Sequence, residues 1–285
     1  MTVLGIDVGT SGARAVIIND RAFVLSSATE EHAPLTSLNI GWAELRPQDW
    51  WRAGGTAVSK ALAIAGLSGD QIQCVGLSGQ MHGAVLLDRQ GDVVRPALIW
   101  CDQRTEPQCL GLSQRIGRAR ILDLTCNTPL TNFTLPKLLW VRENEPEHWK
   151  RVASFLLPKD YVRYQLTGEL ATDVTDASGT LLFHVAQRQW SSTMRNHADI
   201  DERLFPKAYE SAEGAAVTRL RIGTPVVAGA GDQSAGAVGM EVVRPGTVSA
   251  TIGSSGVVFA ATDAPVLYPQ GRLHTFCHAV PGRWL

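Results

Sequence analysis

The chain has 285 residues, of which 26 are basic and 27 acidic, so its formal net charge is −1. Hydrophobic residues make up 45% and charged residues 19%, the balance expected of a soluble globular protein with a sizeable core. This near-neutral balance, with no run of Lys or Arg, argues against a nucleic-acid-binding or membrane-surface protein.

Short β-branched runs at the N-terminus predict three antiparallel strands, at residues 3–6, 13–18 and 23–27. The first two flank a glycine turn at residues 8–12, so we expect them to form a hairpin.

The next two hundred residues alternate between short apolar runs and amphipathic stretches. We predict a first helix at 50–65, with Pro47 before it and Asp49 as a candidate cap, and a further helix after Thr134 as its cap. A helix at 159–167 is expected to end at Gly168. The helix after Thr134 is expected to span 135–143. The other predicted elements are strands at 74–77, 84–87, 93–94, 97–100 and 154–157 and a helix at 105–116. This alternation predicts an α/β protein.

The C-terminal part contains a second glycine turn between strands. An apolar strand at 225–230 is followed by Gly231, Asp232 and a small-residue helix at 234–239, and strands at 248–252 and 257–261 then flank residues 253–256. The unit at 250–256 repeats the pattern of residues 6–12. We therefore expect one domain at 1–244 and the beginning of a second, similar domain at 245–285. Half a repeat buries its own core poorly, so the chain is expected to be truncated.

The N-terminus lacks a basic segment followed by a long apolar one, and no apolar stretch approaches the roughly 20 residues of a spanning helix. The five cysteines are odd in number and irregularly spaced, which is typical of reduced thiols. We expect a cytoplasmic protein.

The first glycine turn has the chemistry of a phosphate-binding loop. Glycines 9 and 12 let the backbone approach a ligand closely, and Thr10 and Ser11 add two hydroxyls. Asp7 is a candidate Mg²⁺ ligand, and Arg14 could direct its charge to the same phosphates. The alternative is an ordinary tight hairpin. A second turn of this kind favours two facing hairpins that hold a triphosphate.

Asp232 stands at the end of a strand, after glycines and before small residues, where a carboxylate could accept the proton of an attacking sugar hydroxyl. A helix N-cap is the alternative for this residue. After the strand at 74–77, His82 could hydrogen-bond a sugar hydroxyl and Met81 could pack on its carbon face, although a single histidine of this kind is more often structural. Trp100 either covers the sugar ring or packs in the core.

Two other features carry less weight. Asp102 and Arg104 are expected to pair with each other. Asp173, Asp176 and Gly179 faintly resemble a calcium loop, but the required glutamate at its twelfth position is replaced by a histidine. We expect no calcium site there.

The motifs together resemble the FGGY carbohydrate kinases of the actin-like ATPase superfamily. Residues 7–12 resemble the family's first phosphate motif, and Gly253, Ser254, Ser255 and Gly256 resemble its second. The segment 231–233 is similar to the one that carries the catalytic base, so the resemblance assigns that role to Asp232. It implies an actin-like, ribonuclease H-like fold, with a mixed sheet, flanking helices and a cleft between two domains.

The segment 79–83 resembles the xylulose kinase subgroup, whereas glycerol kinases have an Arg-Glu pair at this point. The resemblance implies sugar contacts from Gln80, Met81, His82, Trp100, Asp232 and Gln233. It implies Mg²⁺ and ATP as cofactors, with ATP bound mostly by the second domain, and transfer of the γ-phosphoryl group to the 5-hydroxyl of D-xylulose. A kinase for another ketose or polyol, and an inactive sugar-binding fragment, are the alternatives. Sugar and nucleotide are the expected partners, and a homodimer is left open.

Overall fold

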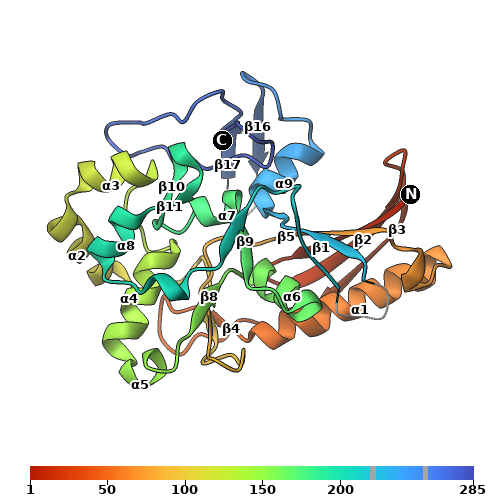
Figure 1. The fold of residues 1–285 in the computed structure, drawn as a ribbon, viewed down its shortest axis with the longest axis horizontal. Coiled ribbons are helices and arrows are strands. Elements are labelled where there is room, and N and C mark those ends of the chain that lie inside the picture. Colours follow the sequence, from red (N-terminus) through yellow and green to blue (C-terminus); the bar gives the residue numbers. More distant parts are fainter. Residues whose placement is uncertain (219–222, 253–255) are drawn as a thin grey trace.

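The computed structural model describes residues 1–218, 223–252 and 256–285. These residues contain a seven-stranded mixed sheet (Figure 1). In spatial order its strands are β13 (Gly214–Val217), β14 (Pro225–Val227), β5 (Cys74–Gly79), β1 (Thr2–Val8), β2 (Gly12–Asn19) and β3 (Val24–Glu31), and β15 (Ala230–Gly231) also pairs with β5. β1, β2 and β3 are antiparallel, as predicted. β5 runs parallel to β1, and β14 and β15 both run parallel to β5.

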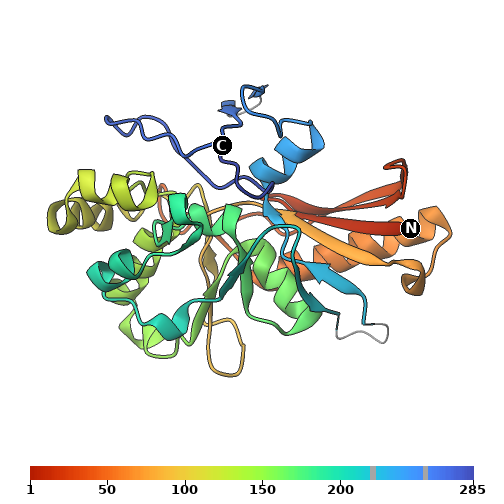
Figure 2. The ribbon, with the colours of Figure 1, turned by 45° about the horizontal axis from the view of Figure 1, so that its top comes forward.

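Helices cover both faces of this sheet. Helices α1 (Pro47–Ala65) and α6 (Pro158–Thr167) lie on one face, and α9 (Asp232–Gly239) lies on the other (Figure 2). Alternation along β1 explains the split, because Leu4, Ile6 and Val8 are buried toward α1. Asp7 therefore points to the opposite face, toward α9.

Beside the sheet, the molecule has a helical lobe that contains short strand pairs. This lobe has its own hydrophobic core, built around Phe133, Leu138 and Phe155. Its elements are β4 (Glu44–Leu45), β6 (Val85–Leu87), β7 (Ala97–Leu98), α2 (Glu106–Ile116), α3 (Arg118–Thr125), α4 (Thr134–Asn144), α5 (Pro146–Trp149), β8 (Ser154–Leu156), β9 (Ala171–Asp173), α7 (Val174–Ser178), β10 (Phe183–His184), β11 (Gln189–Trp190), α8 (Ser192–Ala198) and β12 (Lys207–Tyr209), with 3-10 turns at Val185–Gln187 and Glu202–Leu204. A further 3-10 turn, at Gly69–Gln71, connects α1 to β5 beside the main sheet.

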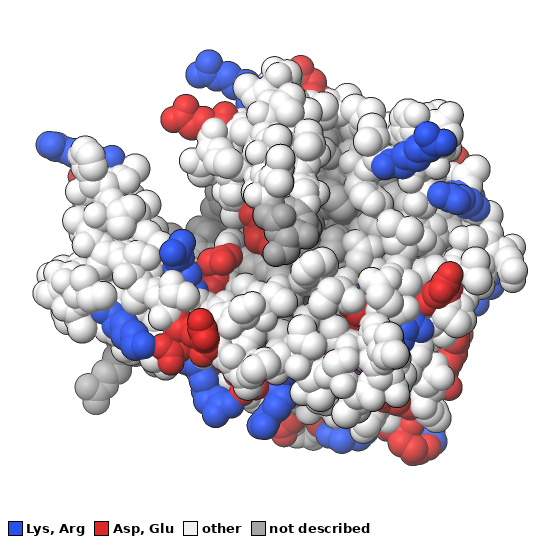
Figure 3. Space-filling view, turned by 180° about the vertical axis from the view of Figure 1, so that it is seen from behind, with Lys and Arg blue, Asp and Glu red and all other residues white. Residues whose placement is uncertain are grey.

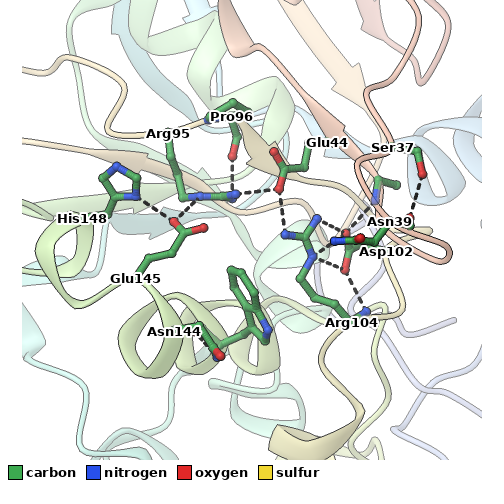
Figure 4. A network of polar contacts seen from close by, with 12 residues as sticks. Ser37, Asn39, Glu44, Arg95, Pro96, Asp102, Arg104, Asn144, Glu145 and His148 are labelled. Atoms are coloured by element: carbon green, nitrogen blue, oxygen red, sulfur yellow. Dashed lines mark hydrogen bonds and ion pairs between the residues drawn. The ribbon is translucent and has the colours of Figure 1, made fainter.

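A buried ionic network fixes the loop that follows β7 (Figure 4). Arg104 contacts Glu44 at 2.7 Å and Asp102 at 2.7 Å, and Arg95 joins Glu44 at 2.6 Å to Glu145 at 2.7 Å. The predicted pairing of Asp102 with Arg104 is confirmed. Each charge has an opposite partner within hydrogen-bond distance, so the network tolerates its burial.

Two predicted helix caps are wrong. Arg46 is the N-cap of α1, while Asp49 lies inside the first turn and pairs with Arg52. Thr134 is the first residue of α4 and donates its hydroxyl to a backbone carbonyl outside the helix. Gly168, in contrast, ends α6 with φ +77°, as predicted, because a left-handed residue is required there.

The last part of the chain leaves the sheet and then returns to the helical lobe. β16 (Val248–Ile252) and β17 (Gly256–Ala260) form the predicted antiparallel hairpin. Farther on, the Thr275 carbonyl accepts a 2.9 Å bond from Asn127, and the Cys277 amide donates to Ser178 at 3.1 Å. None of the helices within the described ranges is both long and apolar enough to cross a membrane.

Candidate active site

The carboxyl ends of β1, β5 and β15 meet at one edge of the sheet. In the parallel register Asp7 lies opposite Ser78, and Gly231 lies opposite Gly79. The Ser78 hydroxyl donates to the Asp7 carboxylate. Because Asp232 directly follows β15, the strand ends bring it to the same edge as Asp7, where α/β proteins commonly bind ligands.

The turn between β1 and β2 is too tight for side chains at its two glycines. The Gly9 amide donates to the Gly12 carbonyl at 2.9 Å, and a Cβ on Gly9 would lie only 2.9 Å from that same oxygen. A Cβ on Gly12 would lie 2.5 Å from the Glu30 carbonyl oxygen. Thr10 and Ser11 form the tip of the turn, so the hydroxyls of these two residues lie at the ends of β1 and β2.

Arg14 stands beside Asp7 in the antiparallel register of β1 and β2. Its Nε donates to the Thr29 hydroxyl at 3.3 Å, and the side chain is exposed. Arg14 and Asp7 share a cavity of about 580 Å³ between the sheet and α9. The cavity is lined mostly by small or apolar residues, including Gly5, Gly76, Val227, Ala235 and Val238.

Asp232 is the first residue of α9, and Gly231 is the N-cap, so the N-cap alternative for Asp232 is wrong. Its carboxylate accepts a 2.8 Å hydrogen bond from the Gln233 amide. Burial raises the pKa of Asp232 to about 6, the Gln233 amide opposes this rise, and the negative charge of Asp7 adds to it. A carboxylate that titrates near neutrality is well matched to general-base catalysis.

Met81 lies directly against the backbone that carries Asp232. A Cβ on Gly231 would lie 2.7 Å from Met81 Cγ and 2.9 Å from its sulfur, so only glycine leaves room for this contact. The expected proximity of Asp232 to the 80–82 segment is therefore present. Gln233 is exposed on the same helix.

His82 is a neutral imidazole held in a defined orientation. Burial lowers its pKa to about 3, and its Nδ1 lies 2.9 Å from the Gly179 carbonyl. A neutral ring next to a carbonyl carries its proton on Nδ1, which leaves Nε2 as a hydrogen-bond acceptor. The ring packs edge-on against Phe133, with centroids 5.0 Å apart.

Gln80 and Trp100 contact the glycine turn. The Gln80 side-chain amide donates to the Gly9 carbonyl at 3.1 Å, and the Trp100 indole donates to the Thr10 hydroxyl at 2.9 Å. Trp100 is 40% exposed, so its alternative role as a core residue is wrong. The residues expected to hold sugar and those expected to hold phosphate are thus in direct contact.

The second predicted phosphate turn is described only in part. Gly256 is the first residue of β17, whereas Gly253, Ser254 and Ser255 lie outside the described residues. Seen from behind, the surface of the molecule is hollowed beside a central lobe, and basic and acidic side chains are interspersed mainly around the periphery of this face (Figure 3).

Sequence reasoning missed several residues that the structure places around the site. Ser78 contacts Asp7, Phe133 supports His82, and Thr175 accepts a 2.9 Å hydrogen bond from the Gly231 amide. Gly179 contacts His82 so closely that a Cβ there would lie 2.6 Å from the ring. Ser78 adjoins the predicted sugar segment at 79–83, whereas Phe133, Thr175 and Gly179 are far from the site in the sequence.

Residues 2–239 match the family described as FGGY family of carbohydrate kinases, N-terminal domain. The chain belongs to this family. As predicted, the chain has the actin-like ATPase fold, with a mixed sheet and flanking helices.

Relatives of this FGGY chain include the xylulose kinase of Escherichia coli, 40% identical over 99% of the chain and 58% of the relative, and that of Bacillus subtilis, 38% identical over 97% and 56%. The crystal structure of a xyloylose kinase from Brucella ovis aligns with a TM-score of 0.95 and 37% identity, over 100% of this chain and 59% of that one. The chain thus spans less than two thirds of the length of these relatives. The domain boundary between residues 244 and 245 stays a prediction.

Proposed function

We propose that this chain is the sugar-binding and base-carrying part of an ATP-dependent xylulose kinase. The observation that carries the proposal is the position of Asp232, whose pKa is raised to about 6, next to Met81 and at the same sheet edge as the glycine turn. The similarity to xylulose kinases favours D-xylulose as the substrate. The segment at 79–83 also lacks the Arg-Glu pair that is typical of glycerol kinases.

In the proposed reaction, Asp232 accepts the proton of the 5-hydroxyl of D-xylulose as the hydroxyl oxygen attacks the γ-phosphorus of ATP. The new oxygen–phosphorus bond forms while the bond from the γ-phosphorus to the bridging oxygen of ADP breaks. The products are D-xylulose 5-phosphate and ADP, and the proton remains on Asp232 until solvent removes it. Neutral His82 orients the sugar by accepting a hydroxyl hydrogen bond at Nε2, and Met81 packs on its carbon face.

The glycine turn is the proposed binding site for the phosphates. Its backbone amides and the hydroxyls of Thr10 and Ser11 are suited to anionic oxygens, and Arg14 adds a positive charge. Asp7 offers a hard oxygen ligand beside the cavity, which fits Mg²⁺, and the ion would supply neutralisation of the phosphate charge. We propose that residues 253–256 contribute a second phosphate turn, and that the kinase acts in the cytoplasm.

Two alternatives share the same site. A kinase for another ketose or polyol would use Asp232 in the same way with different contacts at Met81 and His82. A sugar-binding fragment without turnover would keep the sugar contacts at Met81 and His82 but would not transfer a phosphoryl group.

The test combines calorimetry with a coupled assay of ADP formation on the purified chain. We expect heat of binding with D-xylulose, and ADP formation that requires it. Heat without ADP would support the binding fragment, and a response to a different sugar in a panel of ketoses and polyols would replace the substrate. Asp232→Asn should abolish turnover and leave the Kd for xylulose within about threefold, whereas exposed Asp20→Asn should change neither. Unchanged turnover in Asp232→Asn removes the base assignment.

A further inference from the structure

The short helix α7 contacts both halves of the candidate sugar site. At its N-terminal end the Thr175 hydroxyl accepts a 2.9 Å hydrogen bond from the amide of Gly231, the residue directly before Asp232. At its C-terminal end the Gly179 carbonyl lies 2.9 Å from His82 Nδ1. Helix α7 lies near the centre of the molecule, at the side of the helical lobe that is close to α9 (Figure 1). It therefore spans the distance between the base and the sugar contact.

The Thr175 hydroxyl has a fixed orientation. It donates its own proton to the Asp173 carboxylate at 2.6 Å, and the Thr175 amide donates to the same oxygen at 2.8 Å. A hydroxyl has a single proton, and the Thr175 hydroxyl uses it in the bond to Asp173. Its oxygen lone pairs therefore remain to accept the hydrogen bond from the Gly231 amide. Ser211 donates a further bond, at 3.0 Å, to the same Asp173 oxygen.

Asp173 is itself held by a buried lysine. Its second carboxylate oxygen lies 2.8 Å from Lys159 Nζ, and Lys159 also contacts Asp160 at 2.6 Å. All three side chains are fully buried. The contact with the lysine holds the Asp173 carboxylate in place, and hydrogen bonds between a carboxylate and its donors are stronger than those between neutral groups.

The Asp232 side chain has little support of its own. The described residues provide it with one hydrogen bond, from the adjacent Gln233 amide, which moves with it. The position of the carboxylate is therefore set by the backbone at Gly231, and that backbone is bonded to Thr175.

We propose that Asp173 and Thr175 are positioning residues that fix the candidate base Asp232 through the Gly231 amide. This inference rests on the proposed function, because it assumes that the position of Asp232 matters for phosphoryl transfer. Neither residue contacts the sugar in this scheme. Their loss should therefore lower the rate of the chemical step more than it weakens sugar binding.

The chain offers a matched control. Thr172 matches Thr175 in side-chain type and in burial, since both are fully buried, but the Thr172 hydroxyl has no hydrogen-bond partner among the described residues. Thr172→Val and Thr175→Val make the same chemical change at equal burial. Thr175→Ser keeps both hydrogen bonds and removes only a methyl group.

The experiment measures hydrogen exchange of the Gly231 amide together with kinase kinetics in these three variants. In Thr175→Val we expect exchange protection at Gly231 to fall at least about tenfold and kcat to fall about 10- to 100-fold, with KM for D-xylulose within about threefold. Thr175→Ser should restore kcat to within about threefold of wild type, and Thr172→Val should match wild type within about twofold. Should the valine variant fail to fold, Thr175→Ala takes its place.

The outcomes separate the two proposals. If the wild-type chain does not turn over, the proposed function fails, while the exchange at Gly231 still tests the link to Thr175. Unchanged Gly231 protection in Thr175→Val overturns the inference. So does an equal loss of kcat in Thr172→Val, or a rise in KM that matches the fall in kcat, because either result indicates a general structural role.

Discussion

Asp232→Asn should make the protein more stable at alkaline pH while it removes activity. In the folded chain, burial raises the pKa of this carboxyl from 3.8 to about 6. Below pH 3.8 the carboxyl is protonated in both the folded and the unfolded state, and it has no effect. As the pH rises to about 6 and beyond, the unfolded state gains more from ionisation than the folded state does, so stability is lost.

The magnitude follows from the size of the pKa change. At about 1.4 kcal/mol per pKa unit, the full penalty is about 3 kcal/mol at pH 8, and about 1 kcal/mol of it is present at pH 4.5. An asparagine of equal size carries no such penalty. At pH 8 we therefore expect Asp232→Asn to raise the free energy of unfolding by about 3 kcal/mol and Tm by about 6 °C.

Urea unfolding of the two chains between pH 4.5 and 8, in metal-free buffer, measures this difference. The advantage of the variant should shrink by about 2 kcal/mol from pH 8 to pH 4.5. Asp201→Asn provides a control of opposite sign, because hydrogen bonds from Arg203 lower the pKa of Asp201 to about 2 and its removal should destabilise the chain at pH 8. A gain for Asp232→Asn that does not depend on pH, or no gain at all, would refute the reasoning.

Three further substitutions test the site and its support. Gly231→Ala places a Cβ 2.7 Å from Met81 Cγ, so Met81 must shift. The Kd for D-xylulose, measured by calorimetry, should therefore rise at least about tenfold. An unchanged Kd would show that Met81 can move without loss of affinity for the sugar. Lys159→Met leaves Asp173 and Asp176 without their cation and leaves Asp160 with Arg163 alone. It should lower the free energy of unfolding in urea by about 3–5 kcal/mol, more at pH 7 than at pH 5, and equal losses at the two pH values would contradict this. Trp100→Phe removes the 2.9 Å bond to Thr10 and should raise KM for both xylulose and ATP severalfold in the coupled assay, whereas a change in xylulose alone would contradict the link.

Much of the fold could be predicted because local patterns specify it. The hairpin of β1 and β2, helix α6 with its terminal Gly168, and the hairpin of β16 and β17 all follow from residue alternation and glycine placement. The caps at Asp49 and Thr134 were not predictable in the same way. Pro47 starts α1 two residues before Asp49, and Thr134 bonds the carbonyl of His82 instead of its own helix.

The candidate site was predictable only in its outward-facing residues. Asp7 lies near the end of β1, Thr10 lies in the turn that follows it, and Asp232 directly follows β15, so their positions at strand ends could be inferred from sequence. The support of Asp232 could not, because the bond from Gly231 to Thr175 joins residues 56 positions apart. In the sequence, the segment around Thr175 resembled only an incomplete calcium loop. Its function as a packed link between two distant segments depends on tertiary contacts that no local spacing encodes.

The return of the chain from the β16–β17 hairpin to the helical lobe has a mechanical consequence. The hairpin is joined to the rest of the molecule twice, once through α9 and once through the segment at Thr275 and Cys277. A body tethered at two separate points can rotate about the line that joins them, but it cannot swing freely as it would on one linker. We therefore expect any movement of the β16–β17 hairpin relative to the sheet to follow a single arc.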